Sequence, residues 1–124
     1  MKRLTAEWVR KADEDFLAAR TLARQSAPLH DAVSFHCQQC AEKYLKALLQ
    51  ESGAPVPRTH ELVALHSLVA PHYQIRGLLR GLKFLTDFAV EFRYPPVRAT
   101  KRQATSALRW AAKVRDACRT LLKP

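Results

Sequence analysis

The sequence of 124 residues has little glycine, few aromatic residues and no long apolar run. Glycine occurs 3 times, and aromatic residues make up 8% of the chain. The alternating valine, isoleucine and threonine patterns of β-strands are absent, whereas alanine, leucine, arginine, lysine and glutamate dominate. No apolar stretch approaches the ~20 residues that a membrane-spanning helix needs. The composition therefore argues against a membrane protein and favours an all-α fold.

Cysteine is also scarce, with three residues, of which Cys37 and Cys40 lie within one helical turn. An odd and small number of cysteines makes a disulfide framework unexpected, so we predict a reducing, cytoplasmic location. The N-terminal segment lacks the apolar core of a secretory signal, which agrees with that prediction. The length suits one domain, and we expect residues 1–124 to form it.

Positive charge is abundant and unevenly distributed along the chain. The formal net charge is +10. Residues 1–61 hold 9 basic and 8 acidic residues, whereas residues 62–124 hold 12 basic and 3 acidic residues. A strongly basic half suits a polyanion or an acidic protein partner. A solvated basic face without any ligand explains the same pattern equally well.

Apolar residues recur at three- and four-residue steps through most of the chain, as in helices with one buried face. Proline and glycine residues separate these periodic segments. The predicted helices span residues 5–25, 31–51, 61–70, 75–92 and 100–122. The expected N-caps of the first three are Thr5, Asp31 and Thr59. Short connections between long helices predict an all-α, up-and-down antiparallel bundle of four long helices plus one short helix.

The helix predicted over residues 31–51 carries an apolar face and a polar stripe. The stripe comprises His36, Gln39, Lys43 and Gln50, with Glu42 and Lys46 alongside. Glu42 and Lys46 are spaced as a favourable (i, i+4) ion pair. Periodicity alone favours an ordinary solvated helix surface for all of these residues.

His36, Cys37 and Cys40 have the residue types and the CxxC spacing of half of a zinc site. No second CxxC or HxxxH follows, and both cysteines fall on the apolar face of the helix. Packing in the core is therefore the better interpretation, and we predict no metal site and no cofactor. Glycine-rich nucleotide-binding motifs are also missing.

The stretch Phe35–Leu49, FHCQQCAEKYLKALL, resembles the signature helix of the HEPN family (higher eukaryotes and prokaryotes nucleotide-binding domain). Three further segments resemble the family in the same order, namely Ala12–Phe16, Thr59–Leu62 and Arg93–Pro95. The resemblance implies a bundle of four or five helices that often forms a homodimer. It also implies a possible partner, because many bacterial and archaeal relatives are encoded beside a minimal nucleotidyltransferase, and some such pairs are toxin–antitoxin modules.

In those modules the HEPN protein is a metal-independent RNase, whose site resembles an arginine followed after four to six residues by a histidine. Here the corresponding positions after Arg93 hold Arg98, Ala99 and Thr100, and no histidine follows His72. Arg24 and His30 have the spacing but straddle the break at Pro28. General acid–base cleavage needs a proton carrier near pH 7, which is usually histidine.

We therefore expect a non-catalytic module that binds nucleotide or RNA phosphate, a nucleotidyltransferase partner, or both. The predicted phosphate-binding residues are Arg93, Lys43, Lys46, Gln39, His36, Tyr94 and Arg98. One alternative is an endoribonuclease toxin that uses Arg93 with His36, and another is a purely structural helical adaptor. The candidate apolar residues for a homodimer interface are Leu17, Phe84 and Phe88.

Overall fold

The computed structural model describes residues 1–91 and 94–123, without the side chains of residues 88–91. The described residues form five α-helices and one 3-10 turn. These are α1 (Arg3–Ala23), α2 (His30–Ser52), α3 (Leu62–Val69), η1 (Arg76–Leu78), α4 (Leu79–Glu91) and α5 (Lys101–Leu121). The predicted all-α fold with one short helix is confirmed. No helix in this part of the chain is long and apolar enough to cross a membrane.

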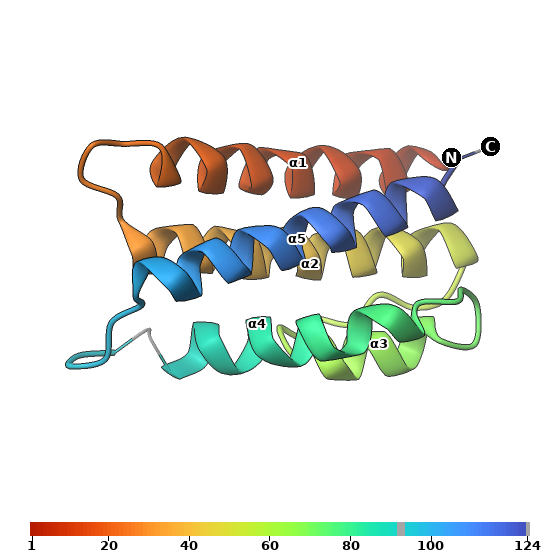
Figure 1. The fold of residues 1–124 in the computed structure, drawn as a ribbon. Coiled ribbons are helices and arrows are strands. Elements are labelled where there is room, and N and C mark those ends of the chain that lie inside the picture. Colours follow the sequence, from red (N-terminus) through yellow and green to blue (C-terminus); the bar gives the residue numbers. More distant parts are fainter. Residues whose placement is uncertain (92–93, 124) are drawn as a thin grey trace.

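Helix α2 is the centre of the bundle and contacts each of the other four α-helices (Figure 1). Its neighbours α1 and α5 run along it, while α3 and α4 cover its other side. The α1–α2 and α4–α5 connections lie at the same end of the bundle, and the start of α1 and the end of α5 lie at the opposite end (Figure 1). Tyr44, Leu45 and Leu48 of α2 are completely buried. Burial on several sides explains why α2 is rich in apolar residues beyond one stripe.

The three predicted N-caps of the first three helices are wrong, because the structure places Lys2, Leu29 and Glu61 at these positions. Thr5 lies inside α1, where its buried hydroxyl donates to Glu51 Oε1 at 2.9 Å. Asp31 lies in the first turn of α2, and its Oδ1 accepts from the backbone N–H of Ala99 at 2.6 Å. Each side chain resembles a cap in sequence, but it binds a distant part of the chain instead. Thr59 does not cap α3 either, because its hydroxyl accepts from the backbone N–H of Glu61, the residue before the helix, at 3.2 Å.

Asp13 joins three helices through its carboxylate. The Tyr44 hydroxyl of α2 donates to Asp13, and Arg115 Nε and Arg119 Nη1 of α5 donate to it at 3.0 and 2.9 Å. Burial, followed by the hydrogen bond to Asp13, raises the pKa of Tyr44. The buried Tyr44 hydroxyl therefore has a hydrogen-bond acceptor. Arg115 and Arg119 of α5 bind a carboxylate of α1 and so stabilise the packing of these helices.

Helices α4 and α5 approach each other closely at Gly81. A Cβ atom at this position would lie 2.1 Å from Cε3 of Trp110, so only glycine leaves room for the indole ring. The first turn of the predicted fourth helix is the 3-10 turn η1. Helical periodicity places Ala89 and Phe92 on the inward face of this segment, but both lie outside the described side chains.

Candidate functional site

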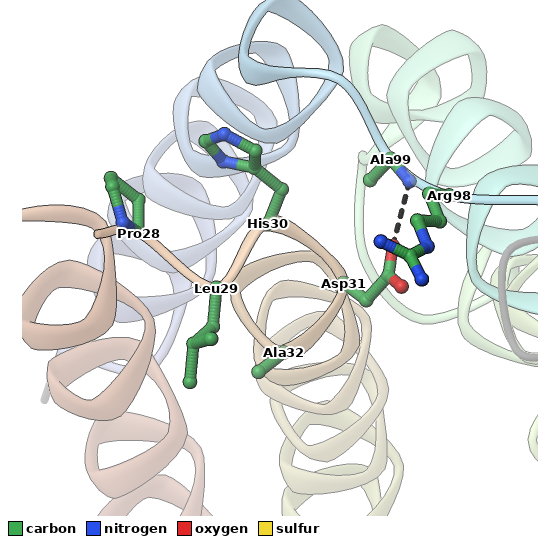
Figure 2. Close-up of a pocket in the computed structure, with 7 residues that line it drawn as sticks. All are labelled: Pro28, Leu29, His30, Asp31, Ala32, Arg98 and Ala99. Carbon is green, nitrogen blue, oxygen red and sulfur yellow. Dashed lines mark hydrogen bonds between the residues drawn. The ribbon is translucent and has the colours of Figure 1, made fainter.

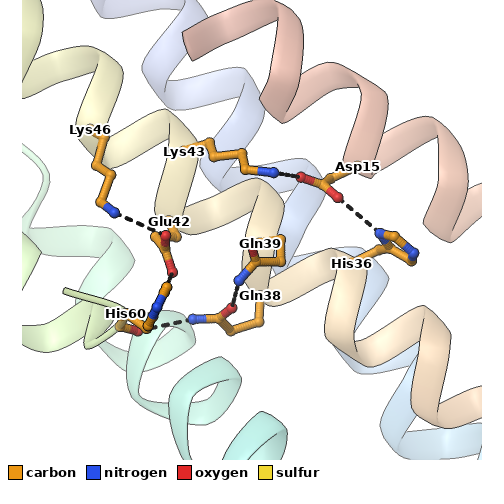
Figure 3. A network of polar contacts seen from close by, with 8 residues as sticks. All are labelled: Asp15, His36, Gln38, Gln39, Glu42, Lys43, Lys46 and His60. Atoms are coloured by element: carbon orange, nitrogen blue, oxygen red, sulfur yellow. Dashed lines mark hydrogen bonds and ion pairs between the residues drawn. The ribbon is translucent and has the colours of Figure 1, made fainter. Parts of the chain in front are cut away.

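The polar stripe of α2 forms a network with two residues from other parts of the chain (Figure 3). We call this network the α2 polar cluster. Its members are Asp15, His36, Gln38, Gln39, Glu42, Lys43, Lys46 and His60. Asp15 comes from α1, and His60 comes from the connection between α2 and α3.

Asp15 binds two of the predicted site residues at once. Lys43 Nζ donates to Asp15 Oδ2 at 2.5 Å, and His36 Nδ1 lies 2.8 Å from Asp15 Oδ1. The carboxylate is only 12% exposed, so its charge is poorly screened by water. The positive charge of Lys43 is therefore balanced within the protein. The His36 ring is oriented by a carboxylate at Nδ1, as in many histidines that transfer protons through the other nitrogen.

Glu42 is the buried anion of the cluster. Lys46 Nζ donates to Glu42 Oε2 at 3.0 Å, and His60 Nδ1 lies 2.9 Å from Glu42 Oε1. The side chains of Glu42 and Lys46 are 4% and 7% exposed, and the Lys46 ammonium lies 5.6 Å from the centre of the Trp8 ring. The predicted ion pair is confirmed. A solvated surface is the wrong interpretation for these two residues, because α1 and the α2–α3 connection cover them.

The glutamines extend the network. Gln38 Nε2 donates to the backbone oxygen of His60 at 3.0 Å, and Gln39 Nε2 donates to Gln38 Oε1 at 2.8 Å. Together with Glu42, Gln38 thus fixes the α2–α3 connection against α2. Periodicity did not identify Asp15, Gln38 or His60 as members of a site. The available signal was that all three fall within the segments that resemble the HEPN family.

A pocket of about 490 Å³ lies at the end of the bundle that holds the α1–α2 and α4–α5 connections (Figure 2). We call it the end pocket. Its lining residues are Pro28, Leu29, His30, Asp31, Ala32, Arg98 and Ala99. The hydrogen bond from Ala99 to Asp31 joins its two walls. Arg98 is exposed, and no described carboxylate lies within ion-pair distance of it.

The structure thus separates the predicted phosphate-binding residues into two groups. His36, Gln39, Lys43 and Lys46 belong to the α2 polar cluster, while Arg98 lines the end pocket. Tyr94, with 69% of its surface exposed, lies in the α4–α5 connection. Arg93 lies outside the described residues. His30, which has the RNase spacing from Arg24 but was not predicted as a site residue, lines the end pocket, and Arg24 is not among the lining residues.

The cysteines lie in the core, as predicted. Cys37, Cys40 and Cys118 are all free and buried. Burial raises the pKa of Cys37 and of Cys118 to about 12, and it also raises the pKa of Cys40. Thiols of this kind remain protonated at neutral pH, which makes them poor nucleophiles and poor metal ligands.

Comparison with known proteins gives one family and two similar folds. The HEPN domain family model matches residues 5–121. TT1696 from Thermus thermophilus has a crystal structure similar to this one, with a TM-score of 0.86 and 24% identity, covering 98% of this chain and 100% of that chain. The crystal structure of ST0689, an archaeal HEPN homologue, has a TM-score of 0.77 and 26% identity, covering 99% and 100%. No curated protein matches the chain.

Proposed function

Because this chain belongs to the HEPN family, we propose that it is a non-catalytic helical module that binds the phosphate of a nucleotide or of RNA. We further propose that it acts as a homodimer beside a minimal nucleotidyltransferase partner in a toxin–antitoxin-type system. The observation that carries the phosphate-binding proposal is Arg98, an exposed cation without a described carboxylate partner on the wall of a pocket. Leu17 on α1, which is 63% exposed, supports the homodimer.

The two groups of predicted residues differ in their readiness to bind phosphate. Lys43 and Lys46 already donate to Asp15 and Glu42, so a phosphate would have to compete with a carboxylate for each of them. Arg98 forms no ion pair among the described residues, and the Asp31 carboxylate that lines the same pocket accepts from the backbone N–H of Ala99. Guanidinium groups bind phosphate with two parallel hydrogen bonds. His30 adds a ring N–H, and Arg93 and the exposed Tyr94 are close to Arg98 in sequence. We therefore assign phosphate binding to the end pocket and a structural role to the α2 polar cluster.

Replacing Arg98 with alanine is expected to weaken ATP binding by at least tenfold. A hydrogen bond to a charged group contributes about 1.5–3 kcal/mol, which corresponds to roughly ten- to hundredfold in affinity. Isothermal titration calorimetry with ATP measures the change. Arg58→Ala is the matched control, because Arg58 is also exposed but lies in the α2–α3 connection and does not line the end pocket. Equal affinities of the Arg98 and Arg58 variants would contradict the assignment.

The partner is tested by affinity purification of the chain from its native host. We expect a small nucleotidyltransferase to co-purify with it. Recovery of the chain as a free dimer, with no such protein, would leave only the phosphate-binding and homodimer parts of the proposal.

RNA cleavage is a second candidate function, favoured by one observation: His30 and Arg98 line the same pocket. A histidine could transfer protons while the arginine stabilises the pentavalent phosphate, without any metal. This function predicts cleavage of RNA in EDTA and a loss of about 10²–10⁴-fold in rate for His30→Ala. His36→Ala is the comparison, because His36 is held by Asp15 on α1 and does not line the pocket. The non-catalytic proposal predicts no cleavage above the level of the His30 variant.

A further inference from the structure

The basic residues of α5 fall into two sets with different surroundings. Arg115 and Arg119 bind Asp13 and thereby hold α5 against α1. Lys101, Arg102, Arg109 and Lys113 are exposed, and none of them has an ion pair with a carboxylate in residues 1–87 or 94–123. The second set therefore contributes uncompensated positive charge to the surface.

Three of these cations share one face of the helix. Arg102, Arg109 and Lys113 are spaced by seven and four residues, which brings side chains to the same side of an α-helix. At a rise of about 1.5 Å per residue, they extend over roughly 16 Å along the axis. This face is opposite the buried residues Ala104, Ala107 and Ala111 and thus points to solvent.

Helix α4 adds another cation beside this row. Gly81 of α4 packs against Trp110 of α5, and the exposed Arg80 and Arg109 are the chain neighbours of these two residues. Lys113 Nζ lies 4.8 Å from the centre of the Trp110 ring, which helps to orient its side chain. We call Arg80, Arg102, Arg109 and Lys113 the α5 basic track.

Few opposing charges lie near the track. Asp116 is the described carboxylate of α5; it lies at the C-terminal end of the same face, three residues after Lys113, and 3.8 Å from Arg115. Asp87 is the exposed described carboxylate of α4, seven residues beyond Arg80 and at the C-terminal end of that helix. The central part of the track, around the Gly81–Trp110 contact, therefore remains strongly positive.

From this geometry we infer that the α5 basic track binds the sugar–phosphate backbone of a nucleic-acid strand. The inference rests on the proposed function, because it extends phosphate binding from Arg98 at the end pocket along α5. A mononucleotide is too short to engage cations distributed over roughly 16 Å, whereas successive phosphates of a strand can contact several of them. Arginine and lysine contacts to phosphate attract nucleic acid without reading its sequence.

The surface chemistry favours nucleic acid over an acidic protein. Protein interfaces usually contain an apolar centre with aromatic anchors. The large apolar side chains exposed among the described residues are Met1, Leu4, Leu17, Leu29, Phe35, Leu68, Tyr94 and Val97. None of these lies on α5 or on the described part of α4. A charged face whose aromatic residue, Trp110, is partly buried against Gly81 and lies beneath Lys113 fits a ligand that is held through its phosphates.

The test measures binding of the full-length chain to fluorescein-labelled 12-nucleotide oligo-U and oligo-dT at several salt concentrations. Four phosphate contacts to a single strand predict a log–log salt slope near −2.8, which is about a 50-fold loss of affinity between 50 and 200 mM salt. The double variant Arg109→Glu/Lys113→Glu should reduce the slope by about 1.4 or more and weaken binding at least tenfold. Its ATP affinity should remain that of the wild type.

The matched control is Arg10→Glu/Lys11→Glu, which makes the same change of charge on exposed residues of α1. Far-UV circular dichroism checks that both variants fold. The inference is wrong if the two double variants bind oligonucleotides equally, or if polyglutamate competes as well as oligo-U does. Retained ATP binding in either case would leave the proposed function intact. If Arg98→Ala loses ATP binding while its RNA binding still depends on the track, phosphate binding at the end pocket and nucleic-acid binding by the track are both supported. If the wild type binds neither ATP nor oligonucleotides, both proposals are overturned.

Discussion

Replacing Glu42 with alanine is expected to lower the free energy of unfolding by about 3–5 kcal/mol. The substitution leaves the Lys46 ammonium buried, at 7% exposure, without the carboxylate that balances it. It also removes the acceptor of His60, which helps to fix the α2–α3 connection. Urea unfolding followed by circular dichroism at pH 7 measures the effect.

Two comparison variants separate the buried charge from the lost contacts. His60→Ala should cost much less, because the His60 side chain is 80% exposed and its removal leaves the Glu42–Lys46 pair in place. Glu42→Leu/Lys46→Met should recover most of the stability, since similar apolar groups often replace a buried ion pair at little cost. A Glu42→Ala variant within about 1 kcal/mol of the wild type would show that Lys46 reaches solvent readily.

Replacing Tyr44 with alanine should also cost about 3–5 kcal/mol, as is usual when an aromatic side chain is removed from a core. Tyr44 is completely buried at the centre of α2, so the vacated space would be lined by residues of several helices. The free energy of unfolding from urea titration tests this value. If the alanine variant fails to fold, Tyr44→Leu, which preserves more volume, provides the same comparison at smaller cost.

The matched variant Tyr44→Phe isolates the hydrogen bond to Asp13. It keeps the ring and removes only the hydroxyl, so a loss of about 0.5–1.5 kcal/mol is expected. Arg115 and Arg119 continue to bind Asp13 in this variant. A loss as large as that of Tyr44→Ala would mean that the contact with Asp13, and not packing of the ring, dominates.

Much of the fold is predictable because helix periodicity is a local property. The predicted segments 31–51 and 100–122 agree closely with α2 and α5, and Thr100 forms a capping box with Gln103. The start of α1 differs, because Thr5 and Glu51 are 46 residues apart in the chain and their contact has no local signature. The same reason applies to Asp31, whose acceptor oxygen is taken by Ala99.

The candidate site was predictable only in part. The resemblance of residues 35–49 to HEPN proteins identified the family, and the family model confirms it. The spacing of the α2 lysines did not reveal that Lys43 forms an ion pair with a carboxylate of another helix. Lys43 is balanced by Asp15 of α1, and an exposed lysine at the same position of an isolated helix would have an identical sequence pattern.

Helix α2 shows which features of this protein the sequence determines and which the tertiary structure determines. The sequence by itself determined that residues 31–51 form a helix with an apolar face and a Glu42–Lys46 pair, because both depend on spacing along one helix. Only the tertiary structure decided that this pair is buried, that Asp15 and His60 complete the network, and that Arg98 remains without a described carboxylate beside a pocket. Burial and long-range pairing depend on which helices meet, and distant residues in the chain determine that.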